Sequence, residues 1–135
     1  MPRVSQLYFK VGILFLIAGI GVGLHMAIGG DHSAMGAHAH INLLGWVTSA
    51  LFGVYYALNP DKAATRVAYV QFAIYTLGVL VMTPSLYMLL SGYPGAEPLV
   101  AVGSLVVAAG VLLFAVILFL PARSAAMPQG MMPAE

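Results

Sequence analysis

Four long apolar stretches alternate with three short polar breaks along the chain. Each stretch is long enough to cross a bilayer core, which takes about 20 helical residues. Because lipid offers no hydrogen-bond partner to irregular backbone, the pattern predicts an all-α integral membrane protein, an antiparallel four-helix transmembrane bundle forming a single domain, residues 1–135. The predicted helices cover residues 8–28, 38–58, 67–90 and 98–120.

The positive charges are distributed unevenly around these helices. All five Lys and Arg residues fall near the start of the first helix, in the second break or after the fourth helix. Cytoplasmic loops of membrane proteins are enriched in Lys and Arg, so both termini are predicted to be cytoplasmic, in a bacterial inner membrane, with the first and third loops toward the periplasm. These residues are Arg3, Lys10, Lys62, Arg66 and Arg123.

The composition agrees with a lipid environment, since 61% of the residues are hydrophobic and 7% are charged. A net charge of +1 provides no basic surface, so we expect no nucleic-acid partner. The absence of cysteine excludes disulfides and thiolate-bound metals. Any metal chemistry must therefore use His, Met, Tyr or carboxylate groups. Residues 122–135, rich in Pro, Ala and Met, are predicted to form a flexible tail.

Small residues recur at helical spacing on the first two predicted helices. Gly19 and Gly23 form a GxxxG step, and Gly45, Ser49 and Gly53 repeat four residues apart. Helices in lipid associate through close backbone approach at such positions. The pattern predicts packing seams, either within one chain or between subunits.

All four histidines lie between residues 25 and 40. Metal-seeking side chains at membrane depth are costly and are functional candidates. At about 1.5 Å per residue, His25 lies about 25 Å and His40 about 27 Å above the inner ends of their predicted helices. We therefore expect the two imidazoles to share a level near the periplasmic face, as axial ligands of a haem or ligands of a smaller metal ion. His38 and His40 are about 200° apart around one helix and should point to opposite sides.

Two helix faces follow from this separation. His38 shares a face with Asn42 and Gly45, whereas the face below His40 is apolar and would suit a haem macrocycle. A copper-handling protein is the alternative, because thioether and imidazole ligands suit Cu(I), with His32, Met26 and Met35 as further ligands. A cofactor-free accessory subunit is the third possibility.

The segment His38–Trp46, with the sequence HAHINLLGW, resembles the second transmembrane helix of the haem-copper oxidase subunit I superfamily. The similarity is closest to the C-type oxidases and nitric oxide reductases. It implies that His40 is an axial ligand of a haem b, with Asn42, Gly45 and Trp46 in the same motif. It also implies electron transfer or O2 or NO chemistry with a redox partner protein. An enzyme of this kind would be an oxidoreductase.

The chain also departs from that family. Subunit I has about twelve helices and carries further histidine ligands in its later helices, whereas this chain has no histidine after His40. The large subunit is organised as three four-helix arcs, and the chain is similar to one arc. The resemblance therefore implies a homotrimer in which His40 and a partner ligand such as His25, from the same or the adjacent chain, hold the haem.

Overall fold

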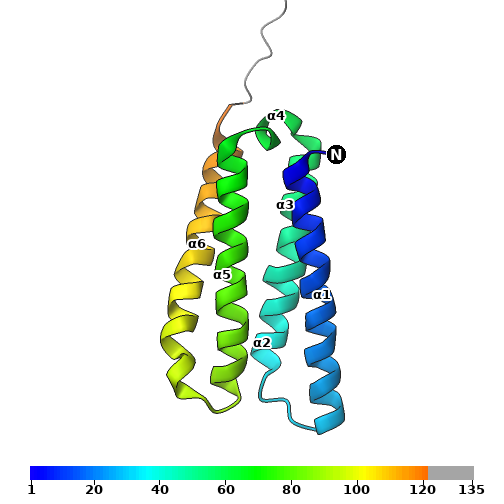
Figure 1. Ribbon diagram of the computed structural model, residues 1–135, viewed down its shortest axis with the longest axis vertical. Coiled ribbons are helices and arrows are strands. Elements are labelled where there is room, and N and C mark those ends of the chain that lie inside the picture. The colour runs from blue at the N-terminus through cyan, green and yellow to red at the C-terminus, as the bar shows by residue number, and fades with distance from the viewer. Residues whose placement is uncertain (122–135) are drawn as a thin grey trace, which may run out of the picture.

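The structure, a computed structural model, describes residues 1–121, so the predicted tail at 122–135 lies outside the described residues. Within 1–121 the fold is entirely helical, and four helices are long and apolar enough to cross a membrane (Figure 1). The second of them consists of three consecutive segments. The elements are α1 (Arg3–Gly29), α2 (Met35–His40), η1 (Ile41–Thr48), α3 (Ser49–Leu58), α4 (Pro60–Ala63), α5 (Arg66–Leu90), η2 (Pro94–Ala96) and α6 (Glu97–Phe119).

The four predicted helices are confirmed, with corrections at their ends. The first helix begins at Arg3 rather than at residue 8, because Pro2 lies at the N-cap position and nothing between it and Lys10 interrupts the helix. It ends where Gly30 adopts a left-handed conformation with φ 66°. The second helix begins three residues earlier than predicted, at Met35, and the fourth ends at Phe119 rather than at residue 120.

A second correction concerns the helix expected to be a regular α-helix over 38–58. Its central segment η1 is a π-helix of eight residues. Side-chain hydroxyls support the wide turn by reaching carbonyls five residues back: Thr48 Oγ1 donates to the Leu43 carbonyl at 2.8 Å. From α5, Tyr75 Oη donates to the Leu44 carbonyl at 2.9 Å. Hydrophobic periodicity carries no signal for these bonds, so the sequence prediction missed the π-helix.

The helices form two close pairs, α1 with η1 and α3, and α5 with α6 (Figure 1). The glycine seams predicted on the first two helices lie inside the chain: a Cβ on Gly19 would come within 2.5 Å of Asn42, and one on Gly45 within 2.5 Å of Phe15. The α5–α6 pair has a further glycine seam, at which each glycine lies against the backbone of the facing helix and which the sequence analysis did not single out. There, Cβ atoms would approach backbone atoms of the facing helix to 2.6–2.8 Å at Gly78, Gly103 and Gly110.

A buried hydrogen-bond network joins the two pairs. Tyr8 on α1 and Tyr56 on α3 both donate to Oε1 of Gln71 on α5. The Gln71 amide donates in turn to the Gly110 carbonyl on α6 at 3.2 Å. These three side chains have no exposed surface. One amide therefore connects all four membrane-length helices.

Replacing Gln71 with Leu should lower the free energy of unfolding by about 2 kcal/mol, because two buried hydroxyls and one carbonyl lose their partner. Thermal or SDS unfolding in mild detergent, followed by circular dichroism, measures the loss. The triple variant Tyr8→Phe, Tyr56→Phe, Gln71→Leu should be more stable than Gln71→Leu alone, because it removes the orphaned hydroxyls. A triple variant no more stable than the single one would contradict the role of the network.

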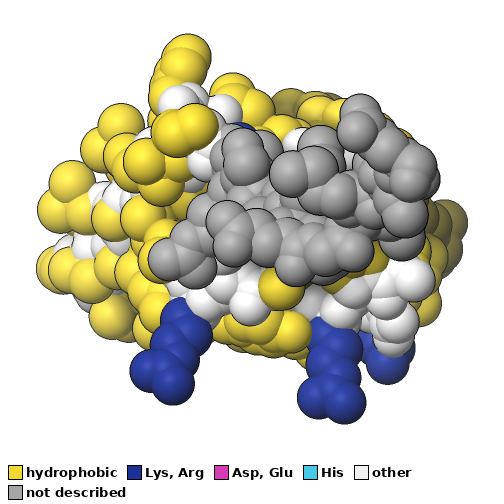
Figure 2. Space-filling view, turned by 90° about the horizontal axis from the view of Figure 1, so that it is seen from above, with side chains coloured by type: hydrophobic (Ala, Val, Ile, Leu, Met, Phe, Trp, Pro, Cys, Tyr) yellow, Lys and Arg dark blue, Asp and Glu magenta, His cyan; other side chains and the backbone are white. Residues whose placement is uncertain are grey.

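The basic side chains of the described part gather at one end of the molecule. Arg3 and Lys10 lie in the first turns of α1, and Lys62 and Arg66 lie in α4 and at the start of α5. Figure 2 views this end, which also carries the N-terminus and the end of α6 (Figure 1). The placement agrees with the charge pattern of the sequence. The orientation of the chain in a membrane stays a prediction.

Candidate functional site

His38 lies in the contact between α1 and α2. Its ring is half-buried, and Nδ1 lies 2.8 Å from the Gly19 carbonyl. A carbonyl only accepts hydrogen bonds, so Nδ1 carries the proton and donates. The ring fits because Gly23 has no side chain: a Cβ there would lie 2.9 Å from Cε1 of His38. Asn42 Nδ2 donates to the His38 backbone carbonyl at 2.9 Å. His38 therefore fastens α2 to α1.

His40 is on the other side of the same helix, as the sequence predicted, and its side chain is exposed. Nδ1 donates to the Gly36 carbonyl one turn back, at 2.7 Å. This bond fixes the ring orientation and, in the neutral ring, leaves the Nε2 lone pair available. Metal-binding histidines commonly have this arrangement, with one nitrogen held by a carbonyl and the other on the metal.

The surface below His40 is apolar. Leu44 is half-buried, and Val47, Leu51 and Val54 are exposed. Leu44 packs against the core, whereas Val47, Leu51 and Val54 form an outward face on the described part of the chain. It offers aliphatic contacts to a flat apolar group or to lipid.

The positions of His25 and His40 require a correction. His25 is exposed, and it lies about 200° around α1 from Gly23, the residue that contacts His38. Both His25 and His40 are therefore turned away from the α1–α2 contact. The antiparallel register, with Gly23 beside His38 and Gly19 beside Asn42, puts His25 about four residues, or about 6 Å, nearer than His40 to the end of the bundle that carries the α1–α2 loop. The prediction that the two imidazoles lie at one level was therefore wrong by about one helical turn. It counted the rise from residue 8 as the start of the first helix, whereas α1 begins at Arg3.

The other residues of the resemblance motif serve packing within the chain. Gly45 accommodates the Phe15 ring, and Trp46 packs over Gly12, where a Cβ would lie 3.1 Å from the indole. Neither lies on the outward face of His40. Sequence reasoning placed them in the motif but could not tell which side of the helix meets α1.

The weaker candidates surround the first loop. His32 and Met35 are exposed, whereas Met26 is 4% exposed and packed inside. Asp31 is bonded to the Ser33 backbone N–H at 2.9 Å, and this bond lowers the pKa of its carboxyl below the usual range. Among residues 1–121, no group of three or more His, Cys, Asp or Glu side chains is placed to hold a metal ion.

Sequence reasoning did not single out the Gly36 carbonyl and assigned no role to Gln71. Every residue has a backbone carbonyl, so the sequence indicates the Gly36 acceptor only through its spacing of four residues from His40. Gln71 did leave a signal: it is the one amide of the third apolar stretch, and such side chains in lipid usually bond across helices.

In comparisons with known proteins, no family model, no curated protein and no solved structure matches this chain.

Proposed function

We propose that the chain is a b-type haem protein of the bacterial inner membrane, working in electron transfer or in O2 or NO chemistry, with His40 as an axial ligand. The observation that carries the proposal is the His40 imidazole, which is held at Nδ1 by the Gly36 carbonyl and open at Nε2 on an outward apolar face. The resemblance of His38–Trp46 to the haem-copper oxidase subunit I superfamily supplies the identity of the metal group.

The residues fit one half of a haem site within one chain. His40 would provide the first ligand, while the exposed Val47, Leu51 and Val54 would provide an apolar wall that keeps water from the macrocycle. The bound haem would supply a redox-active iron, whose open or filled sixth position decides between gas chemistry and electron transfer. Among residues 1–121, no Lys or Arg lies at this end to meet the propionates, so exposed loop groups such as Ser33 and Tyr93 are their candidate partners.

The other half of the site must come from elsewhere, because His25 of the same chain faces away from His40. We propose a homotrimer in which the outward face of His40 meets α1 of the neighbouring chain, and His25 of that neighbour is the opposing ligand. His38 then acts within each chain, keeping α2 and its His40 fixed on α1 through the Gly19 carbonyl. Both termini would be cytoplasmic, and a redox partner protein would exchange electrons.

The test is the optical spectrum and mass of the purified protein in mild detergent. We expect a Soret band in the oxidised protein, a shift on reduction by dithionite, and a mass of about three chains with bound haem. A six-coordinate signature supports His25 as the opposing ligand, and a five-coordinate one excludes it. Colourless protein that binds copper would favour the copper-handling alternative, and colourless, metal-free protein would favour an accessory subunit. A monomeric mass would exclude the trimer.

A further inference from the structure

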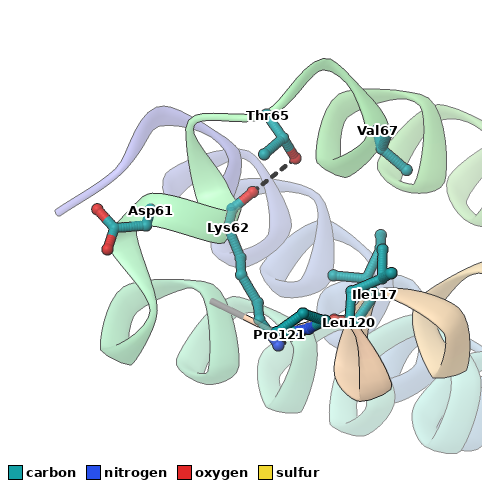
Figure 3. Close-up of a pocket in the computed structure, with 7 residues that line it drawn as sticks. All are labelled: Asp61, Lys62, Thr65, Val67, Ile117, Leu120 and Pro121. Atoms are coloured by element: carbon teal, nitrogen blue, oxygen red, sulfur yellow. Dashed lines mark hydrogen bonds between the residues drawn. The ribbon is translucent and has the colours of Figure 1, made fainter. Parts of the chain in front are cut away.

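A cavity of about 280 Å³ opens at the basic end of the molecule, between the start of α5 and the end of α6 (Figure 3). Ligand pockets usually measure about 300 to 1000 Å³, so this volume suits a slender group rather than a broad one. We call this cavity the basal groove. Its lining residues are Asp61, Lys62, Thr65, Val67, Ile117, Leu120 and Pro121.

One wall of the basal groove is apolar and lies at the end of two membrane-length helices. Val67 is 44% exposed at the start of α5, and Leu120 is 54% exposed just beyond α6. The Thr65 hydroxyl does not add a free donor, because it donates to the Lys62 carbonyl at 2.7 Å (Figure 3). An aliphatic wall at the level where a membrane helix ends is suited to the upper part of a lipid acyl chain.

The groove also contains a positive charge that its own contacts do not neutralise. Lys62 Nζ donates to Tyr55 Oη at 2.9 Å and to the carbonyls of Ile117 and Leu118 at 2.9 and 3.1 Å. All three acceptors are neutral oxygens. The Asp61 carboxylate lies at the rim and points away from the ammonium (Figure 3). Among residues 1–121, no carboxylate therefore pairs with this charge, which can attract an anion in the groove.

A second cation is adjacent in the chain to residues that line the basal groove. Arg66 is exposed and lies between Thr65 and Val67, which both line it. Unlike the Lys62 ammonium, whose three protons are engaged, an exposed guanidinium can donate two parallel hydrogen bonds to a phosphate.

We propose that the basal groove binds an anionic phospholipid of the cytoplasmic leaflet. Its acyl chain lies against Val67, Ile117 and Leu120, and its phosphate lies near Lys62 and Arg66. Anionic lipids are attracted by basic residues at the cytoplasmic surface of membrane proteins. The proposal rests on the membrane insertion and orientation of the proposed function and is independent of haem binding.

Native mass spectrometry of the full chain tests the groove, using phosphatidylglycerol and phosphatidylcholine with identical acyl chains. The wild type should retain phosphatidylglycerol about 25-fold more than phosphatidylcholine, because Lys62 and Arg66 should each contribute about fivefold, the size that one basic residue gives at a membrane surface. Val67→Trp fills the groove without changing charge and should abolish the retained lipid. Val70→Trp makes the same change one turn along α5, outside the groove and 50% exposed, and should keep it.

A second pair of variants separates the groove from general surface charge. Arg66→Gln should reduce the preference for phosphatidylglycerol about fivefold, whereas Arg3→Gln, which removes the same charge at the same end of the molecule, should change it by less than about twofold. Equal retention of the two lipids by the wild type would overturn the proposal, as would equal losses in the two tryptophan variants or in the two glutamine variants. If the purified protein lacks haem but still selects the anionic lipid, the proposed function is refuted and the lipid proposal stands. If carbonate washes the protein from membranes, both proposals are refuted.

Discussion

Replacement of His40 by alanine is expected to remove the Soret band from the purified protein. The substitution deletes the imidazole whose Nδ1 is held by the Gly36 carbonyl and whose Nε2 is the proposed iron ligand. Because loss of a partner that merely orients a ligand weakens metal binding about 10- to 100-fold, loss of the ligand itself should lower haem affinity by more than about 100-fold. Absorbance at equal protein concentration, with haem extracted and quantified, measures the loss.

The control is His38→Ala, two residues away on the opposite face. This variant loses the bond to the Gly19 carbonyl and should unfold at a lower temperature, yet it should keep haem while folded. Imidazole added to His40→Ala should restore part of the band by filling the vacated position. A His40 variant with full haem content, or a His38 variant that alone loses the Soret band, would show that the ligand has been assigned to the wrong histidine.

The substitution Gly78→Leu should lower the free energy of unfolding by about 3 kcal/mol, because overpacking a tight contact forces backbone to move. A Cβ at this position would lie 2.6 Å from the Val107 backbone nitrogen on α6 and 3.0 Å from the Val106 carbonyl carbon. Neither atom can move aside as a flexible side chain would. Unfolding in SDS or by heat, followed by circular dichroism in mild detergent, measures the change.

Gly21→Leu is the matched control. Gly21 lies within helix α1, as Gly78 lies within α5. Unlike Gly78, it is exposed, and a Cβ there meets no atom within 4 Å. The control variant should be at least as stable as the wild type, because leucine has the higher helix propensity. Equal destabilisation by the two substitutions would mean that the α5–α6 seam is looser than the structure shows.

The sequence predicted the four helices because each apolar stretch is long and bounded by turn residues. It also separated His38 from His40, since their angle depends only on helix geometry. It could not show which of them faces α1. That choice depends on Gly19 and Gly23, whose missing side chains make room for Asn42 and the His38 ring.

The register and the π-helix were beyond sequence reasoning for a similar reason. The level of His25 relative to His40 follows from contacts between helices, and a count from assumed helix ends was wrong by one turn. The wide turn of η1 is held in part by Tyr75 from another helix, a bond spanning 31 residues. Local periodicity carries no record of such a partner, so the local pattern predicted an α-helix instead.

The Gln71 network has a consequence for how the chain is built. Each close pair of helices is held by its own glycine contacts, and the amide reaches across both pairs. In a bilayer, helices that insert first and associate afterwards can form each hairpin on its own and dock the two later. Docking is the step that satisfies the amide and both tyrosine hydroxyls together. A half-assembled chain would leave polar groups facing hydrocarbon, and this penalty favours completion of the whole unit over accumulation of separate hairpins.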